Sequence, residues 1–204
     1  MSTLPGPAEV HRFWFGEVDD WAGCAARNNE RWFARGHELD AEIRERFGAL
    51  VETAAAGERE HWRHDAAGAL ALVLCLDQFP RHVHRGTAAA FAHDAQALAI
   101  CTAAVDSGLA AGLSDVEQAF FLLPLEHAED LAVQDRSVAL TRERAKRCEP
   151  ALKPFMEETA RYAAMHRDII ARFGRFPHRN AVLGRASTEE ERDYLDGGGE
   201  RFGQ

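Results

Sequence analysis

One stretch of the chain, residues 65–87 (DAAGALALVLCLDQFPRHVHRGT), restricts the possible fold more than any other. From Ala66 to Leu76 it is apolar at nearly every position, with Gly68 as a weak point, so a helix formed here would be apolar on all sides. Such a helix is buried inside a bundle, because it has no polar face to turn toward water. The run is also too short to cross a bilayer, which takes about 20 apolar residues. We therefore expect a central helix packed among others.

The end of this stretch is polar. Pro80 lacks an N–H and fixes φ, so we expect the helix to end near it and Asp77 to fall in or near the last turn. A carboxylate is unfavourable there, because the unpaired carbonyls of a helix C-terminus already make the field negative. Arg81 and Arg85 are the nearest cations that could pair with it. Two interpretations stay open: an ion pair that ties down a helix end, or a polar constellation directed into a cleft.

The rest of the chain also has helical patterns. Residues 39–54 repeat apolar side chains every three or four positions, residues 114–117 match a capping box, and a long apolar stripe follows Pro154. No alternating strand pattern of useful length occurs. We therefore predict an all-α fold, a multi-helix bundle of about eight helices. A single domain is expected over residues 1–204, with aromatic-rich helices in 1–64 and a short C-terminal helix with a frayed tail in 187–204.

The composition limits both partners and location. With 46% hydrophobic residues over 204 positions, the chain can form a real core. Its net charge of −9 argues against nucleic acid as the main partner. The four cysteines are far apart and form no C-x-x-C pair, which favours reduced thiols and a cytoplasmic location. Neither a signal segment nor an apolar run of about 18 residues occurs, so we expect no membrane partner.

Three polar clusters each lie at a predicted helix end beside a proline. The first and third are mostly cationic, and the second is mostly anionic. If the helices pack antiparallel, several of these ends meet on one rim of the bundle. The clusters are Asp77, Gln78, Arg81, His82, His84 and Arg85; Glu126, His127, Glu129 and Asp130; and Arg172, Arg175, His178, Arg179 and Asn180.

Anion binding is the chemistry that best matches these residue types. Arginine offers a rigid fork of N–H donors that suits a carboxylate or a phosphate. The competing hypothesis is an internal network, in which the arginines neutralise Asp77, Glu126 and Asp130 and no ligand is needed. On the first hypothesis, the ligand-binding residues are Asp77, Gln78, Arg81, Arg85, Glu126, Arg175, His178, Arg179 and Asn180.

His127 is the candidate for proton transfer. On a continuous helix Asp130 would share its face three positions on, and a carboxylate held against an imidazole raises its pKa and fixes its tautomer. We therefore name His127 and Asp130 as candidate catalytic residues. The alternative is that Asp130 caps the next helix. Several histidines could serve a metal, but neither an H-E-x-x-H motif nor paired E-x-x-H motifs occur. No metal ligands are predicted, and the cofactor stays unknown.

Three long segments resemble a known family. They are LALVLCLDQFPRHVHRGTAAAFAHDAQAL, FLLPLEHAEDLAVQDRSV and HRDIIARFGRFPHRNAVLGRAST. Together with FWFG near the N-terminus and Trp32-Phe33, they resemble an uncharacterised bacterial family, domain-of-unknown-function family 924, over most of the chain. The resemblance implies an all-helical, tetratricopeptide-like domain, and it implies no reaction. One departure is Ala128, where the family pattern leads us to expect a small hydroxyl residue.

Two main hypotheses for function follow. In the first, a cytoplasmic helical protein binds a small anionic molecule, or acts on it, in a cleft lined by the three clusters. In the second, a tetratricopeptide-like scaffold binds a protein or peptide, and the clusters are a structural ion-pair network. A metal-dependent enzyme is the third possibility. A pocket with converging polar groups would favour the first hypothesis, and an open apolar groove would favour the second.

Overall fold

The computed structural model describes residues 4–34 and 36–202, and within these residues the fold is all-α, with 76% helix and no strand. Nine α-helices have seven or more residues, which confirms the prediction of about eight; two more have five residues each. The helices are α1 (Pro7–Phe15), α2 (Trp21–Asn29), α3 (Asp40–Ala55), α4 (Ala66–Val73), α5 (Phe79–Val83), α6 (Asp94–Asp106), α7 (Asp115–Phe121), α8 (Leu123–His127), α9 (Leu131–Arg147), α10 (Lys153–Phe173) and α11 (Glu189–Asp196).

The apolar helix expected from the sequence is α4, and it lies in the core. Every residue from Gly68 to Val73 is buried. Asp65 caps the helix, since its side chain accepts a hydrogen bond from the Gly68 N–H at 2.8 Å. Gly68 is needed because a Cβ at this position would lie 2.1 Å from the carbonyl oxygen of Trp62. The backbone of the preceding 3₁₀ turn (Glu60–His64) can therefore pack directly on α4.

The helix does not end at Pro80, and this prediction was wrong. The chain passes from α4 through a π turn (Leu74–Gln78) into α5 and stays helical to Val83. In the π turn the Phe79 N–H donates to the carbonyl oxygen of Leu74, five residues back. The proline then occupies the first turn of α5, where a missing N–H costs nothing. Asp77 consequently lies in the π turn, a type of helix irregularity that often occurs at functional sites.

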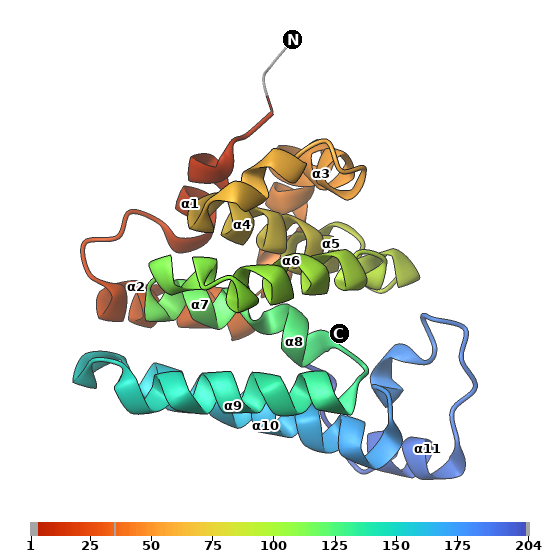
Figure 1. The fold of residues 1–204 in the computed structure, drawn as a ribbon. Coiled ribbons are helices and arrows are strands. Elements are labelled where there is room, and N and C mark those ends of the chain that lie inside the picture. The colour runs from red at the N-terminus through yellow and green to blue at the C-terminus, as the bar shows by residue number, and fades with distance from the viewer. Residues whose placement is uncertain (1–3, 35, 203–204) are drawn as a thin grey trace.

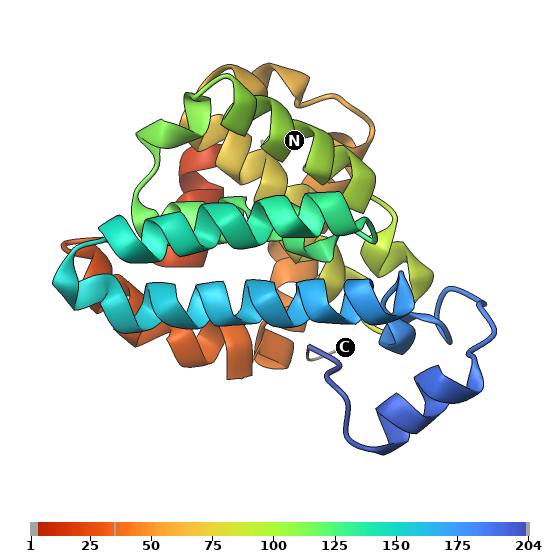
Figure 2. The same cartoon turned by 60° about the horizontal axis from the view of Figure 1, so that its bottom comes forward.

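Helices α9 and α10 form an antiparallel pair that lies side by side in both views (Figures 1 and 2). In Figure 1 this pair makes one layer, and α8 leads into it from the helices that surround α4. After α10 the chain turns at Gly174, which has φ of +71°. It then forms α11 and returns, so that its last described residues lie beside α10 (Figure 2). This return brings the C-terminal segment close to the cavity described below.

One helical stretch among the described residues, Ala88–Asp106, is long and apolar enough to cross a membrane by length and composition. Core helices of water-soluble proteins meet the same criteria. Here the stretch is divided into a 3₁₀ turn (Ala88–Phe91) and α6, and its Asp94 is ion-paired with Arg81 and Arg179. The stretch is therefore weak evidence for a membrane partner.

Candidate functional site

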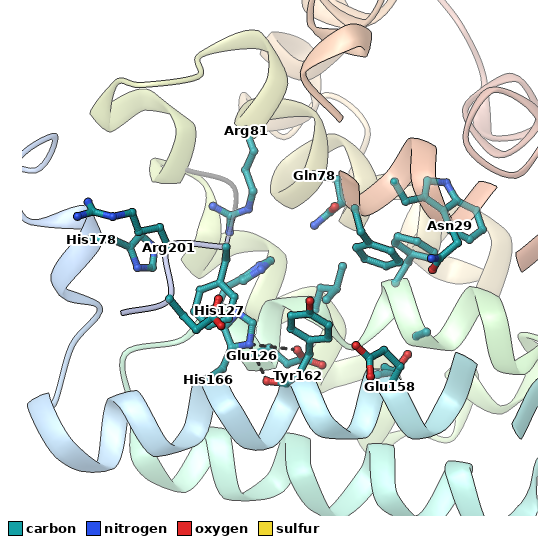
Figure 3. A pocket seen from close by; sticks show the side chains of 18 of the residues that line it. Asn29, Gln78, Arg81, Glu126, His127, Glu158, Tyr162, His166, His178 and Arg201 are labelled. Carbon is teal, nitrogen blue, oxygen red and sulfur yellow. Dashed lines mark hydrogen bonds and ion pairs between the residues drawn. The ribbon is translucent and has the colours of Figure 1, made fainter. Parts of the chain in front are cut away.

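A cavity of about 750 Å³ lies between the α9–α10 layer and the helices around α4 (Figure 3). Its volume falls in the range of small-molecule sites, about 300–1,000 Å³. The three polar clusters all contribute to its wall, although they are far apart in the sequence. The first cluster contributes Gln78, Arg81, His82 and Arg85, the second contributes Glu126 and His127, and the third contributes His178 and Arg179.

Helix α10 supplies one long side of the cavity. Its lining residues Phe155, Glu158, Thr159, Tyr162 and His166 recur every three or four positions and therefore share one face of the helix. With a rise of 1.5 Å per residue, this stripe is about 16 Å long. The cavity is therefore elongated along α10, with Phe155 toward one end and His166 toward the other.

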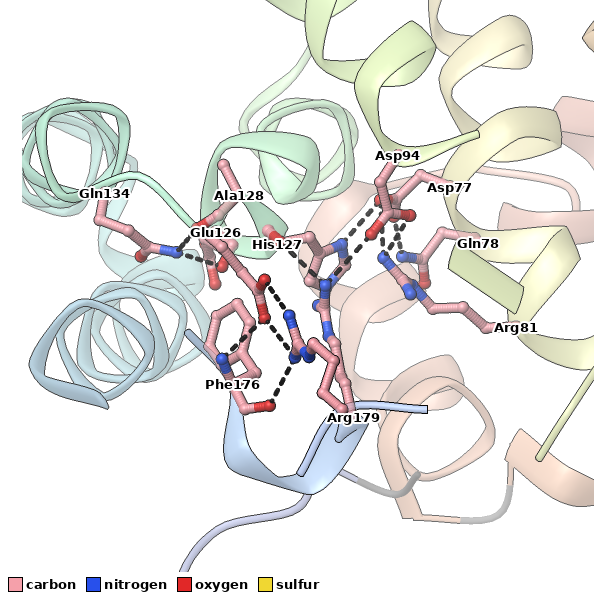
Figure 4. Close-up of polar contacts among 12 residues, drawn as sticks. Asp77, Gln78, Arg81, Asp94, Glu126, His127, Ala128, Gln134, Phe176 and Arg179 are labelled. Carbon is pink, nitrogen blue, oxygen red and sulfur yellow. Dashed lines mark hydrogen bonds and ion pairs between the residues drawn. The ribbon is translucent and has the colours of Figure 1, made fainter. Parts of the chain in front are cut away.

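Asp77 and His127 form the central contact of the site (Figure 4). Asp77 is fully buried, and its Oδ1 lies 2.7 Å from His127 Nδ1 and accepts from the Arg81 guanidinium at 3.1 Å. Its Oδ2 accepts from Gln78 Nε2 at 2.6 Å. Burial opposes ionisation of Asp77, but the neighbouring His127 and Arg81 outweigh it and hold the pKa of the carboxyl well below its usual range. Asp77 is therefore a buried carboxylate that orients an imidazole.

Of the paired residues Asp77 and His127, only His127 lines the cavity. Burial, together with the charge of Arg81, lowers the pKa of the imidazole, so the ring is neutral at pH 7. A neutral ring beside a carboxylate carries its proton on Nδ1, which donates to Asp77. The unprotonated Nε2 is then left for a molecule in the cavity, whose wall includes His127. This is the arrangement that a general base requires.

Arg81 and Arg179 share a second carboxylate, Asp94 on α6. Arg81 donates to Asp94 Oδ1 at 3.0 Å, and Arg179 donates to Oδ2 at 3.3 Å and to the carbonyl oxygen of His127 at 3.1 Å (Figure 4). Burial and the nearby Arg81 lower the pKa of Arg179 to about 10. We call Asp77, Arg81, Asp94, His127 and Arg179 the cavity network.

The carboxylates of these ion pairs stand behind the arginines. Arg85 donates to Asp40 with distances of 2.6 and 2.9 Å, and Arg81 and Arg179 pair with Asp77 and Asp94 as described. The three arginines belong to the cavity wall, whereas the three aspartates do not. A molecule beside these three arginines therefore meets their guanidinium groups before the aspartates.

Glu126 is buried in the wall, with 1% of its surface exposed, and its Oε1 has no hydrogen-bond partner among the described residues. The nearest titratable partner is His166, whose Nδ1 lies 3.7 Å from Glu126 Oε2 and donates to the carbonyl oxygen of Tyr162 at 2.8 Å. Burial, with a contribution from the charge of Asp77, raises the pKa of Glu126 to about 8. Glu126 is therefore protonated at neutral pH and can donate a hydrogen bond.

Other polar atoms at the cavity also lack a partner among the described residues. They are His178 Nδ1 and the Nε atoms of Arg81 and Arg179, each in a residue that lines the cavity. Buried polar atoms are nearly always hydrogen bonded, so a concentration of exceptions at one cavity is informative. These atoms are available to a bound molecule or to water.

Several predicted site residues do not reach the cavity. Asp130 is exposed and caps α9, accepting from the Val133 N–H at 3.1 Å, so the expected pairing of His127 with Asp130 was wrong. The reason is that α8 ends at His127 and Ala128 is extended, which removes the helical spacing. Arg175 and Asn180 bind Glu191 instead of the cavity.

Other residues of the site were not predicted. Asp94 and Asp40 each lie in the first turn of a helix, where a carboxylate commonly serves only the helix dipole, so neither position signals a role in a site. His166 belongs to the apolar stripe of α10, and its spacing with Tyr162 and Glu158 was the available signal. Within the described ranges, no group of three or more His, Cys, Asp or Glu side chains is placed to hold a metal ion.

An all-helical bundle with a polar cavity beside a central π turn is the class of protein defined by this fold and site. Residues 10–199 match the family model described as bacterial protein of unknown function, DUF924, so the chain belongs to that family. The solved structure of the protein of unknown function ATU0120 from Agrobacterium tumefaciens is similar, with a TM-score of 0.77 and 36% sequence identity over 94% of this chain and 97% of that one. A comparison with curated protein sequences found no match.

Proposed function

We propose that the protein binds a small organic anion in this cavity. The observation that carries the proposal is the order of charges at the wall: Arg81, Arg85 and Arg179 face the cavity, and their aspartate partners lie behind them. Guanidinium groups fixed from behind by carboxylates are held in place to donate to a carboxylate or phosphate in front. Glu126, protonated at neutral pH, adds a neutral donor and no repulsion.

The titration of His178 supports the same proposal. Burial, together with the charges of Arg179 and Arg81, lowers its pKa to about 3. Burial contributes most to this shift, and the positive charge of the two arginines adds to it. A bound anion would offset that charge and raise the pKa of His178 toward its ordinary value of about 6.5. Because protonation and anion binding then favour each other, affinity for the anion should increase as the pH falls below about 6.

Titration with simple anions tests the proposal. Acetate, inorganic phosphate and citrate would be added to isotopically labelled protein, and NMR shifts of the cavity histidines would be followed. Arg85→Gln should weaken binding by about tenfold or more, the value of a hydrogen bond to a charged group. Arg167→Gln, which removes an exposed ion pair with Asp135, is the matched control and should leave affinity unchanged. If none of the three anions shifts His127 or His178, the proposal is wrong.

Proton transfer by His127 is a second candidate function, favoured by its 2.7 Å contact with Asp77. In this case Nε2 of His127 would take a proton from the bound molecule or from water, and Glu126 could return one. His127→Gln should then abolish turnover and leave binding and folding intact. Unfolding of this variant would instead identify a core histidine. A cytoplasmic location and a protein or peptide partner stay predictions from the sequence.

The scaffold alternative receives less support from the described residues. It needs an open apolar patch, but the exposed large hydrophobic side chains are Phe33, Leu131 and Tyr162. Two of these, Phe33 and Tyr162, line the cavity. Their exposure is therefore accounted for by the small-molecule site.

A further inference from the structure

We infer that the anion bound in the cavity carries an aromatic ring, which lies against a cluster of aromatic side chains at the end of the cavity away from His178. This inference rests on the proposed function and adds the chemical class of the ligand. The cluster consists of Trp32, Phe33, Phe120 and Phe155, all in the cavity wall. Trp32 links them, with ring centroids 4.6 Å from Phe120 and 6.3 Å from both Phe33 and Phe155.

Phe33 is the residue that points to a ligand. Its ring stacks on that of Phe120, with centroids 5.9 Å apart and planes only 8° from parallel. Phe120 is buried, but Phe33 is 57% exposed, the largest exposure among the large hydrophobic side chains described. Because this exposed ring lies in the cavity wall beside three other aromatic rings, it offers an apolar surface that a bound molecule can cover. An aryl group would extend the existing stack by one ring.

The aromatic cluster and the arginines belong to one continuous cavity. Figure 3 shows Asn29 and Glu158 at one end and His178 and Arg201 at the other, with Tyr162, Glu126 and His127 between them. Glu158 is one helical turn from Phe155, and Asn29 is one turn from Phe33, so the aromatic cluster lies at the Asn29 end. One molecule that spans these two ends would place its anionic group near Arg81 and its ring on Phe33.

The size of the cavity favours a small molecule over a peptide. Its volume of about 750 Å³ suits a ligand of drug-like size. The α10 stripe, about 16 Å long, limits how far the ring and the anionic group can be apart. A flexible spacer of a few bonds between carboxylate and ring is therefore the expected chemistry, and the best spacer length can be found with a homologous series.

The test measures the affinity of phenylacetate, 3-phenylpropionate, 4-phenylbutyrate and 5-phenylpentanoate by NMR titration, with acetate as the reference. At the spacer length that reaches Phe33, affinity should exceed that of acetate by about tenfold or more. Phe33→Leu keeps an apolar side chain but removes the stack, so it should remove most of this gain and weaken binding of the best phenyl compound far more than binding of acetate. Leu131→Ala, at an exposed leucine outside the cavity wall, is the matched control and should change neither.

Each result separates this inference from the proposed function. If acetate binds but no phenyl compound binds more tightly, the inference is wrong and anion binding stands. A gain in affinity that Phe33→Leu does not reduce would place the ring elsewhere and also overturn the inference. The cyclohexyl analogue of the best compound is apolar but not aromatic. If it binds with the same affinity as the phenyl compound, the subsite recognises any apolar group, and the inference of an aromatic ligand is wrong. If no carboxylate binds, the inference is wrong, and the titration with inorganic phosphate then decides whether anion binding stands.

Discussion

The cavity network and a second, partly buried polar cluster use the same residue types but complete their hydrogen bonds differently. We call the second cluster the C-terminal clamp, and it consists of Arg175, Asn180, Ser187, Thr188 and Glu191. Glu191 accepts from Arg175 at 2.6 and 2.8 Å, from Asn180 at 3.1 Å and from the Thr188 N–H at 2.8 Å. Hydrogen bonds from Arg175 lower the pKa of Glu191 to about 2. The protein itself therefore satisfies the hydrogen-bonding capacity of this carboxylate.

At the cavity, by contrast, residues of the network and residues beside it keep unused donors and acceptors. Glu126, His178, Arg81 and Arg179 each have a buried polar atom without a partner among the described residues, and no clamp residue does. A buried unpaired polar group costs about 1–3 kcal/mol, so the cavity is the less stable arrangement. A clamp that holds α11 in place needs no such atoms, whereas a binding site needs them. The comparison predicts that substitutions in the two regions affect stability and binding differently.

The largest effect is expected for Asp77→Asn. Asp77 is fully buried between His127 and Arg81, and removing one charge of a buried ion pair typically costs about 3–5 kcal/mol of unfolding free energy. Urea denaturation measures the loss. Asp135→Asn, at an exposed ion pair with Arg167, should change stability by no more than about 0.5 kcal/mol. A loss below about 1 kcal/mol for Asp77→Asn would show that the cavity network does not anchor the fold.

The next largest effect is expected for Glu191→Gln in the clamp. The substitution weakens the two hydrogen bonds from Arg175 and should lower the unfolding free energy by about 2–3 kcal/mol. Anion affinity should be unchanged, because Glu191 lies outside the cavity wall. Glu190→Gln is the matched control on the same helix, since Glu190 pairs with Arg172 at the surface. A change in anion affinity with Glu191→Gln would contradict the separation of the two regions.

A pH-dependent effect is expected for Glu126→Gln. The pKa of Glu126 is raised to about 8 in the folded protein, whereas in the unfolded chain the carboxyl ionises near pH 4.5. Between these values the unfolded state binds fewer protons, so this residue makes the protein less stable as the pH rises, by at most about 1.4 kcal/mol per pH unit. Glutamine does not titrate.

The variant should therefore match the wild type near pH 4.5 and exceed its stability by up to about 4 kcal/mol at pH 8, because the two pKa values differ by about 3.5 units. Denaturation at several pH values, with Glu158→Gln on the same cavity wall as the control, measures the difference. A constant difference across this pH range would mean that Glu126 is ionised in the folded protein. The residue would then belong with Glu191, as an acid fully stabilised by its surroundings.

Much of the fold could be predicted from the sequence because it depends on local patterns of apolar and helix-capping residues. The apolar run became α4, the capping box at Ser114 and the short C-terminal helix were observed, and the all-α class followed from periodicity. The prediction failed at Pro80, because a π turn can bring a proline into the first turn of a new helix. A proline in the sequence does not by itself distinguish that case from a helix end.

The site was harder to predict because its partners are far apart in the chain. The cluster residues Asp77, Arg81, His127 and Arg179 do meet, but Asp94, which joins two of them, carried no signal in the sequence. Local spacing favoured Asp130 as the partner of His127, and tertiary packing supplied Asp77 instead. Likewise, Arg175 and Arg179 are four residues apart, yet the first belongs to the clamp and the second to the cavity.

The smallest effect is expected where the two regions meet, at Phe202. Its ring stacks on His166 at a centroid distance of 3.7 Å, and it also packs against the cluster of Ile169, Ile170 and Phe176 near the clamp. Phe202→Ala should cost about 1 kcal/mol, the value of an aromatic pair. Burial lowers the pKa of His166 to about 3, so exposing the ring should raise that pKa toward about 6.5.

An NMR pH titration of His166 measures this shift, and Arg201→Ala at the neighbouring exposed position is the control. Phe202→Ala can be combined with Glu191→Gln to separate the two regions. If Phe202→Ala raises the pKa of His166 and leaves the stability loss caused by Glu191→Gln unchanged, the C-terminal segment covers the cavity independently of the clamp. If the pKa of His166 does not move, α10 and the residues around Glu126 bury the ring by themselves. The cavity network and the clamp would then be coupled only through α10, which contributes to the cavity wall and leads directly to Arg175.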